Sequence, residues 1–183
     1  GLSIIIIIGI IIAVIFFSFV GSYNSITVAE EKVESEYSNV SVQLERRADL
    51  IPNLVKVVKG YTNQEEKIIK EITDARKEIS NASNIKELSE ASENLDSALS
   101  SLNIIIENYP DLKSSQNFIN LQDELAGTEN RISVARRDYN QAVKEYNTLI
   151  KKIPTNIIAG MTGKEKATYF EIPKAKTDVP DIE

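Results

Sequence analysis

The feature that most constrains this chain is an uncharged, strongly apolar segment at residues 2–20. Isoleucine dominates it, and it contains no Asp, Glu, Lys or Arg. As an α-helix it is roughly 28 Å long, which is close to the hydrocarbon thickness of a bilayer. It is also too long and too uniformly apolar to be one face of a soluble helix. We therefore expect residues 1–21 to form a transmembrane anchor that binds the lipid bilayer through residues 2–20.

A cleaved signal peptide is the alternative interpretation of this segment. The apolar region of a signal peptide is usually shorter and ends in a small-residue cleavage site. The residues at 18–22, Ser-Phe-Val-Gly-Ser, fit such a site poorly, so a retained anchor is favoured. Its orientation stays open, because the first charges are Glu30, Glu31 and Lys32 and the first arginine is Arg46. The positive-inside rule has almost nothing to act on, and the side of the membrane that the rest of the chain occupies is undecided.

Composition then narrows the possible chemistry. The chain has no histidine and no cysteine, so it lacks the commonest general base, thiol nucleophiles and the usual zinc ligands. We predict no enzymatic activity, no cofactor and no metal. The net charge is −6 with a pI near 4.9, which argues against nucleic acid as a partner and against electrostatic docking of the soluble part to anionic lipid.

Beyond the anchor, apolar residues recur at gaps of three, four or seven, which predicts amphipathic helices. The first runs from about residue 23 to 59, with its stripe at Val33, Tyr37, Val40, Leu44, Ile51, Val55 and Val58. The second carries Ile68, Ile72, Ala75 and Ile79, and the third carries Leu88, Ala91, Leu95, Leu99, Leu102 and Ile106. The fourth carries Phe118, Leu121, Leu125, Thr128, Ile132, Ala135, Tyr139, Val143, Tyr146, Ile150 and Ile153.

Local signals place the ends of these helices. Pro52 should kink the first helix without ending it, since the apolar stripe continues beyond it. Residues 62–65, Thr-Asn-Gln-Glu, are typical of a capping box that opens the second helix. Asn84 together with Glu87 can cap the third. Tyr-Pro-Asp at 109–111 should end the third, and Pro154 should end the fourth.

The predicted fold class is all-α. Short connections between helices favour antiparallel neighbours, so we expect an elongated antiparallel up-and-down helical bundle over residues 22–154, with one N-terminal transmembrane helix. The bundle has four helices, or three long ones if the second and third segments form one continuous helix. Residues 155–183 should form an irregular C-terminal tail near the membrane.

The unequal helix lengths suggest where the chain contacts other molecules. The first and fourth helices outrun the second and third, so their stripes near the membrane should stay partly uncovered. Exposed apolar surface of this kind usually marks a contact with another chain. The candidate self-association residues are Val33, Tyr37, Val40, Tyr139, Tyr146 and Ile150.

Three polar patterns have structural explanations. Arg46, Arg47 and Asp49, like the charges at 129–131, should pair with neighbours three or four residues away on the same helix. Asp123, Glu124 and Glu129 could suggest a carboxylate metal site, but di-iron bundles also use histidine, and this chain has none.

The Tyr-Asn pairs at 139–140 and 146–147 lie one heptad apart, on one helical face, and the pair at 23–24 should lie near the end of the fourth helix. Packing of hydrogen-bonded tyrosines is favoured over partner binding.

Three stretches of the sequence resemble the LemA family. They are Arg-Arg-Ala-Asp-Leu-Ile-Pro-Asn-Leu-Val at 46–55 with Val-Lys-Gly-Tyr at 58–61, Tyr-Pro-Asp-Leu-Lys at 109–113 with Asn-Phe at 117–118, and residues 121–132 with the two Tyr-Asn pairs of the fourth helix. Tyr169-Phe170 also resembles the ending of the family. Asn63 and Gln64 stand where family members often have a histidine. The resemblance implies an N-terminal anchor and a bundle of helices, a bacterial source, and a role in organising membranes that a magnetosome relative suggests; it implies no reaction.

Two functions remain open at this stage. The first is a self-associating membrane scaffold, a homo-oligomer whose anchors bring copies into one plane. The second is an adaptor whose helices bind a different membrane protein, such as a protease or an envelope sensor.

Overall fold

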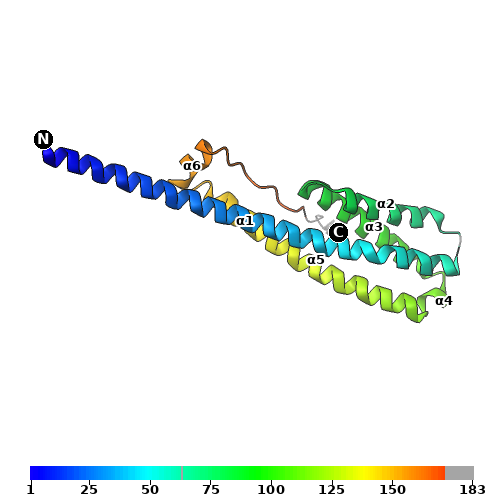
Figure 1. The fold of residues 1–183 in the computed structure, drawn as a ribbon. Coiled ribbons are helices and arrows are strands. Elements are labelled where there is room, and N and C mark those ends of the chain that lie inside the picture. The colour runs from blue at the N-terminus through cyan, green and yellow to red at the C-terminus, as the bar shows by residue number, and fades with distance from the viewer. Residues whose placement is uncertain (63, 172–183) are drawn as a thin grey trace, which may run out of the picture. The chain divides into compact units, whose positions relative to one another are not determined.

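The computed structural model describes residues 1–62 and 64–171. All the regular secondary structure in these two ranges is helical, so the all-α prediction is confirmed. The helices, in chain order, are α1 (Leu2–Tyr61), α2 (Glu66–Asn81), α3 (Ile85–Ile106), α4 (Pro110–Lys113), α5 (Gln116–Leu149) and α6 (Thr155–Met161) (Figure 1).

Helix α1 contains both the predicted anchor and the first amphipathic segment without a break. The Ser25 hydroxyl donates to the Gly21 carbonyl and the Thr27 hydroxyl to the Tyr23 carbonyl, so these small polar side chains are satisfied within the helix itself. The helix also continues through Pro52. The apolar segment is therefore the first part of one long helix.

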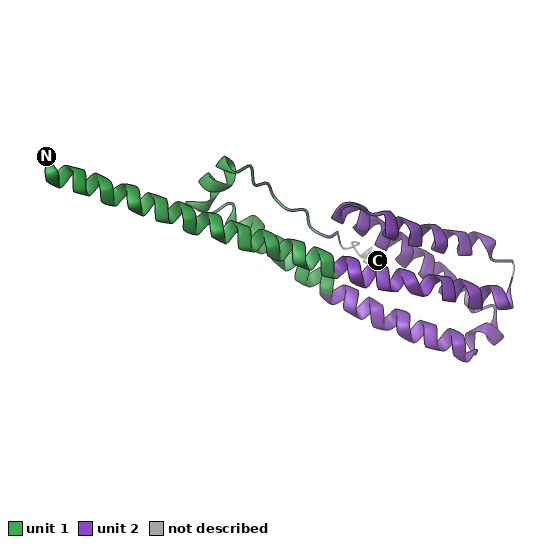
Figure 2. Cartoon of the chain, viewed as in Figure 1, with its two compact units in different colours: residues 1–39, 135–169 green, residues 40–134, 170–183 purple. Residues whose placement is uncertain are grey.

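The chain forms two compact units, which Figure 2 shows in different colours. Unit 1 consists of residues 1–39 and 135–169, and unit 2 consists of residues 40–134 and 170–183. Helices α1 and α5 each contribute one stretch to each unit.

Within unit 2, α2 and α3 form an antiparallel helical hairpin. Asn84 caps α3 by accepting a hydrogen bond from the Glu87 backbone at 3.0 Å, and the Glu87 carboxylate accepts one from the Ser83 backbone at 2.8 Å. Asn94 on α3 donates to Glu78 on α2 at 2.7 Å. The predicted cap at Asn84 is thus confirmed, and the alternative of one continuous helix is wrong because the chain reverses at 82–84.

The core of unit 2 contains most of the apolar stripes that the periodicity predicts, but Val55 and Leu121 are only partly buried. The residues from α1 and α5 that are buried here are Val40, Leu44, Ala48, Ile51, Leu54, Val58, Phe118, Leu125 and Ile132. Polar contacts join their helices to the hairpin: Arg76 donates to the Ala48 carbonyl, and Gln122 donates to Asn103. Hydrophobic burial with a few directed hydrogen bonds accounts for the packing of this unit.

The expected capping box at the start of α2 is wrong. Glu65 is the N-cap residue of α2, and its side chain makes no capping hydrogen bond. The Glu65 carboxylate instead accepts a hydrogen bond from the Tyr109 hydroxyl at 2.8 Å, and that hydroxyl accepts one from Thr62 at 3.2 Å. Tyr109 is the N-cap residue of α4. Thr62 and Glu65, which the sequence predicts as partners within one capping box, therefore connect the loop before α2 to the loop before α4.

Unit 1 packs around one hydrophobic cluster. Ile26 of α1 lies with Tyr146 of α5, Ile150, and Ile158 and Ala159 of α6. Ile26 is fully buried. The predicted proximity of residues 23–24 to the end of the fourth helix agrees with this packing.

Part of the predicted irregular tail is helical. Residues 155–161 form α6, because Thr155, Ile158 and Ala159 supply a small buried face that packs on the cluster of unit 1. Residues 164–171 have no regular secondary structure, and the rest of the predicted tail, 172–183, lies outside the described residues. Ile153, predicted as part of the buried stripe, is 84% exposed because α5 ends at Leu149.

Candidate membrane-contacting site

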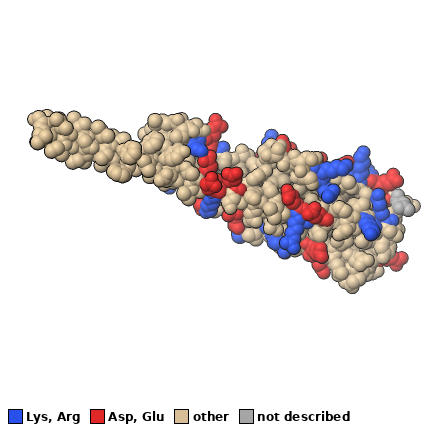
Figure 3. Space-filling view, in the orientation of Figure 1, with Lys and Arg blue, Asp and Glu red and all other residues tan. Residues whose placement is uncertain are grey.

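The apolar segment of α1 has no intramolecular partner among the described residues. The side chains of Leu2, Ile4 and Phe17 are 75%, 62% and 72% exposed, and the most apolar stretch of the helix has no buried residue. Figure 3 shows this segment as a surface without charged residues. By length and composition, this helix can cross a membrane.

Close to the span, α1 packs on one side against α5 and α6. Ile26 follows the last residue of the span, Val20, by six positions, which is about 9 Å along a helix. It already belongs to the buried cluster that contains Ile158 and Ala159 of α6. The apolar segment and the packing that supports it therefore belong to the same compact unit.

The segment after α6 is fixed to α5 by specific hydrogen bonds. The Asn147 side chain donates to the Ala167 carbonyl at 2.9 Å and accepts from the Ala167 backbone N–H at 2.8 Å. The Tyr139 hydroxyl donates to the Thr168 carbonyl at 2.8 Å. An extended segment has no helical partners for its backbone, so these side chains supply them. We call residues 162–169 the strap.

Tyr139 is the most perturbed titratable group of unit 1. Burial is the main cause that raises its pKa from 10 to about 12, and the nearby Tyr37 adds to the effect. Burial also raises the pKa of Tyr146, with a further contribution from Glu30. Both hydroxyls therefore stay protonated at neutral pH, which suits a hydrogen-bond donor and is the opposite of what a general base requires.

Two ion pairs bind the strap and α5 to α1. Lys164 donates to Glu30, and Lys32 donates to Glu145 at 2.8 Å. In each pair the hydrogen bond from lysine to carboxylate raises the pKa of the lysine. These pairs join positions far apart in sequence, so they fix which residues face each other.

Unit 2 contains a buried cation. The Arg47 side chain is 8% exposed, and its guanidinium binds both Asp96 of α3 and Glu129 of α5. The carboxylates are 30% and 39% exposed. The prediction that these charges are structural agrees with this geometry, but the partners of Arg47 come from other helices because the residue points into the core.

Open hollows follow the seam between α2 and α3, lined by residues such as Glu71, Glu78 and Asn94. In residues 1–62 and 64–171, no three Asp or Glu side chains are grouped so that they could hold a metal ion. Asp123 and Glu124, the carboxylates considered in the sequence, are both exposed on α5.

Comparison with known proteins decides the family. The family model described as LemA family matches residues 36–183. The chain belongs to the LemA family.

Individual relatives support this assignment. Protein LemA of Metamycoplasma hominis is 27% identical over 175 residues, an alignment that covers 93% of this chain and 80% of that protein. Magnetosome proteins MamQ 1 and MamQ 2 of Paramagnetospirillum magneticum are each 29% identical over 186 residues, covering 87% of this chain and 68% of theirs. Together with the long apolar helix, this similarity supports a membrane-associated helical protein.

The candidate self-association residues of this LemA-family chain lie mostly inside it. Val40 is fully buried in unit 2, and Tyr139, Tyr146 and Ile150 are 3%, 4% and 8% exposed in unit 1. Val33 and Tyr37 are partly buried. These side chains pack within their own units, so self-association through them requires that they leave their present contacts. The role stays a prediction.

Sequence reasoning missed several residues of the site, namely Asn147, Lys164 and the exposed face of α6. The Tyr-Asn pair at 146–147 was noticed, but nothing in its spacing shows that Asn147 binds the backbone of Ala167. Helix α6 was not predicted because seven residues are too few to show helical periodicity.

Proposed function

We propose that this LemA-family chain is a non-enzymatic, single-pass membrane protein whose helices form a self-associating scaffold at the bilayer surface. The observation that carries the proposal is that α1 continues from an exposed, uncharged span into packed structure as one helix. The proposal is also supported by the lack of histidine and cysteine and by relatives named for magnetosomes.

Continuity of α1 matters for a scaffold. A helix that passes from the bilayer into a packed unit cannot swivel at the membrane surface without breaking its backbone hydrogen bonds. In unit 1, α5, α6 and the strap brace the helix immediately after the span. Unit 1 is thus held in a defined relation to the membrane plane, which is a requirement for ordered assembly and is unnecessary for a freely tethered enzyme.

The surface for self-association has to be one that the fold leaves open. Large apolar side chains that are exposed outside the span include Val28 at 70%, Val42 at 53%, Ile104 at 73% and Val134 at 48%. Anchoring copies in one plane raises their effective concentration, so that weak contacts between such side chains are enough to join them. The span itself adds a second surface, because helices in a bilayer associate through van der Waals packing.

The test is the mass of the purified full-length protein in mild detergent, measured by light scattering at micromolar concentration. We expect a defined oligomer or a ladder of oligomers. A strict monomer under these conditions, and again after reconstitution into lipid nanodiscs, contradicts the scaffold. One dominant heterologous protein recovered from native membranes, without self-crosslinked species, favours an adaptor in its place.

Substitutions then locate the contact. Val28→Glu and Val42→Glu place a charge on exposed apolar positions and should dissolve the oligomer while leaving helicity unchanged, as circular dichroism can check. Glu34→Gln, at an exposed polar position of α1, is the matched control and should leave the mass unchanged. Charged substitutions at Tyr146 or Ile150 are uninformative, because both side chains are buried and the change would unfold unit 1.

A further inference from the structure

Helix α6 has two apolar faces, and only one of them is covered. Thr155, Ile158 and Ala159 are buried against the cluster of unit 1. On the outside, Ile157 is 60% exposed and Met161 72%, and the preceding Ile153 is 84% exposed. Two large apolar side chains of this seven-residue helix, and a third just before it, are therefore left in contact with water. We call these three side chains, Ile157 and Met161 on α6 and Ile153 just before it, the outer face of α6.

The level of this face along α1 follows from its packing. Ile158 and Ala159 belong to the same buried cluster as Ile26, which lies about 9 Å beyond the end of the span at Val20. The polar layer on each side of the hydrocarbon is about 5–8 Å thick. Helix α6 therefore lies beside the part of α1 that leaves the bilayer, at the height where headgroups meet water.

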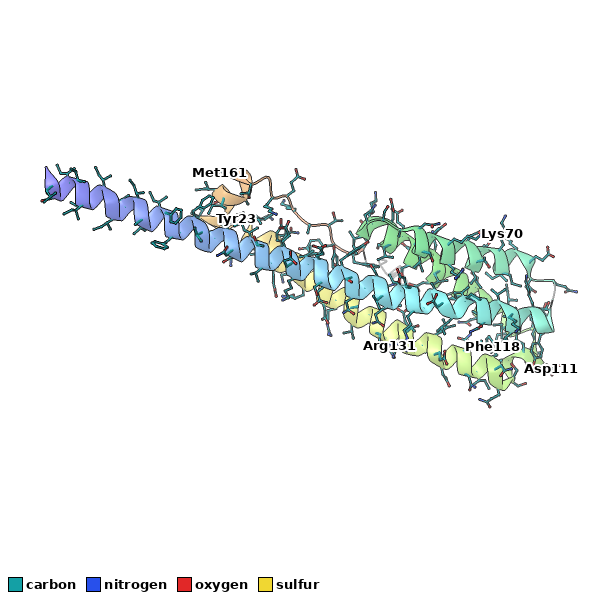
Figure 4. The ribbon with its side chains drawn as sticks, in the orientation of Figure 1. Tyr23, Lys70, Asp111, Phe118, Arg131 and Met161 are labelled. Carbon is teal, nitrogen blue, oxygen red and sulfur yellow. The ribbon has the colours of Figure 1, made fainter. Side chains whose placement is uncertain are left out.

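Two labelled residues show the arrangement directly. In Figure 4, Met161 of α6 and Tyr23 of α1 are labelled near each other, where the apolar span of α1 ends. Tyr23 is 42% exposed, and it lies close enough to Lys164 to influence the pKa of that lysine. Tyrosine is enriched at membrane–water interfaces because its ring is apolar and its hydroxyl is wet.

The charge around α6 differs from that of the rest of the chain. Residues 151–167 contain four lysines and one glutamate, although the whole chain has a net charge of −6. Lys151, Lys152 and Lys166 are exposed, while Lys164 pairs with Glu30. The expectation that the soluble part avoids anionic lipid rests on total charge, and this local basic cluster has the opposite sign. Lysines beside an apolar face are typical of segments that lie in a lipid interface.

We propose that α6 is a membrane foot: its outer face enters the headgroup layer of the same bilayer that the span crosses, and Lys151, Lys152 and Lys166 bind anionic headgroups. The proposal rests on the span crossing the bilayer. The geometry favours lipid as the molecule that covers the outer face, because the span already places the bilayer beside α6. Three side chains are too few for a stable protein interface, which buries on the order of 1,000 Å² or more.

The chain contains no cysteine, so single-cysteine variants of the full-length protein can carry one fluorescent label each. Ile157→Cys and Met161→Cys probe the foot, Ile11→Cys probes the span, and Glu34→Cys is a control at an exposed polar site of unit 1. Each variant is reconstituted in nanodiscs and exposed to nitroxide-labelled lipids of known depth and to aqueous iodide. We expect labels at 157 and 161 to be quenched by nitroxides at headgroup depth and to be less open to iodide than the label at 34, which iodide alone should quench.

The four labels separate the possible failures. If the label at 11 lies in hydrocarbon while those at 157 and 161 are as open to iodide as the label at 34, the foot is overturned and the anchor stands. If the label at 11 is also open to iodide, the proposed membrane-spanning function fails as well. Labels at 157 and 161 that neither quencher reaches would mean that protein covers the face, which also overturns the foot.

Lipid charge tests the second half of the proposal. In nanodiscs of phosphatidylcholine with phosphatidylglycerol, the label at 161 should be quenched by lipid more strongly than in pure phosphatidylcholine. The triple change Lys151→Gln, Lys152→Gln and Lys166→Gln should abolish this difference, and Lys67→Gln, Lys70→Gln and Lys86→Gln on unit 2 should preserve it. Equal quenching in both lipids for the unaltered lysines overturns the binding of anionic headgroups.

Discussion

Arg47 shows how a single residue can hold several helices together. It carries a full charge in the core of unit 2, and its Nε has no hydrogen-bond partner. The positive charge of its guanidinium is compensated by the carboxylates of Asp96 from α3 and Glu129 from α5. Burying a charge is costly unless it is paired, so the three side chains stabilise the unit only as a set.

We expect Arg47→Met to destabilise the protein by about 1–3 kcal/mol, because Asp96 and Glu129 would lose their cation but can still be hydrated. Chemical unfolding in detergent, followed by circular dichroism, measures the loss. Arg137→Met is the control: Arg137 is 73% exposed and pairs with its neighbour Asp138, and its loss should cost less than about 0.5 kcal/mol. Equal losses in the two variants would contradict the role of Arg47.

Because of Tyr139, we expect the stability of the protein to fall at alkaline pH. Its pKa in the folded state is about 12, against an ordinary value of 10, so the folded state holds the hydroxyl proton more tightly. Its contribution is complete below pH 10 and is lost as the pH rises towards 12. Tyr139→Phe also removes the hydrogen bond to Thr168, at a cost of about 1 kcal/mol at neutral pH.

Thermal unfolding at a series of pH values tests this prediction. The loss of stability between pH 10 and 12 should be smaller in Tyr139→Phe than in the unaltered protein. Lys32 and Lys164 also have raised pKa values and lose their contributions in an overlapping range, so part of the dependence should remain in the variant. An unchanged dependence would show that Tyr139 does not contribute.

At the scale of elements, periodicity predicted the helices and their buried faces well where the segments are long. The stripes of α2, α3 and most of α5 are buried at the expected positions. The cap at Asn84 was predictable because it uses only residues within one turn. The box at 62–65 failed because Tyr109, 44 residues away in sequence, takes the Glu65 carboxylate. A capping motif in the sequence predicts only hydrogen bonds between neighbouring residues. It does not show that a residue far away in the sequence can bind the same side chain.

The cap of α3 gives a prediction at this scale. Asn84→Ala should destabilise the hairpin by about 1 kcal/mol, because the Glu87 backbone N–H loses its acceptor. Denaturant unfolding measures the change, and Asn81→Ala, at an exposed position at the end of α2, should have a much smaller effect.

The pKa of Glu87 is lowered, chiefly by the hydrogen bond from the Ser83 backbone. The contribution of Glu87 is therefore present at neutral pH and is lost as the pH falls through that lowered pKa.

At the scale of the molecule, membrane association was predictable because nineteen uncharged residues have few other uses. The candidate contact residues were less accessible to prediction. Periodicity shows that Tyr146 and Ile150 share a face, but it does not show that α6 folds back to cover them. The division into two compact units was also hidden, because α1 and α5 pass through both without a break.

Charging the span should release the chain from the membrane. Ile7→Lys combined with Ile11→Lys should cost about 6 kcal/mol of insertion free energy, at about 3 kcal/mol for each lysine near the helix centre. Alkaline extraction of membranes measures the fraction that stays in the pellet, which should fall. Val28→Lys combined with Val42→Lys, both at exposed positions outside the span, is the control. The anchor is contradicted if both double variants remain in the pellet equally.

The one-sided position of α6 has a consequence for geometry within the membrane plane. A lone helix that crosses a bilayer is free to spin about its long axis. A second point of lipid contact, displaced to one side of that axis, removes the spin and gives each copy a fixed azimuth. Neighbouring copies would then meet with the same edges facing each other, so the two-dimensional order of an assembly would be set by seven residues at the water boundary.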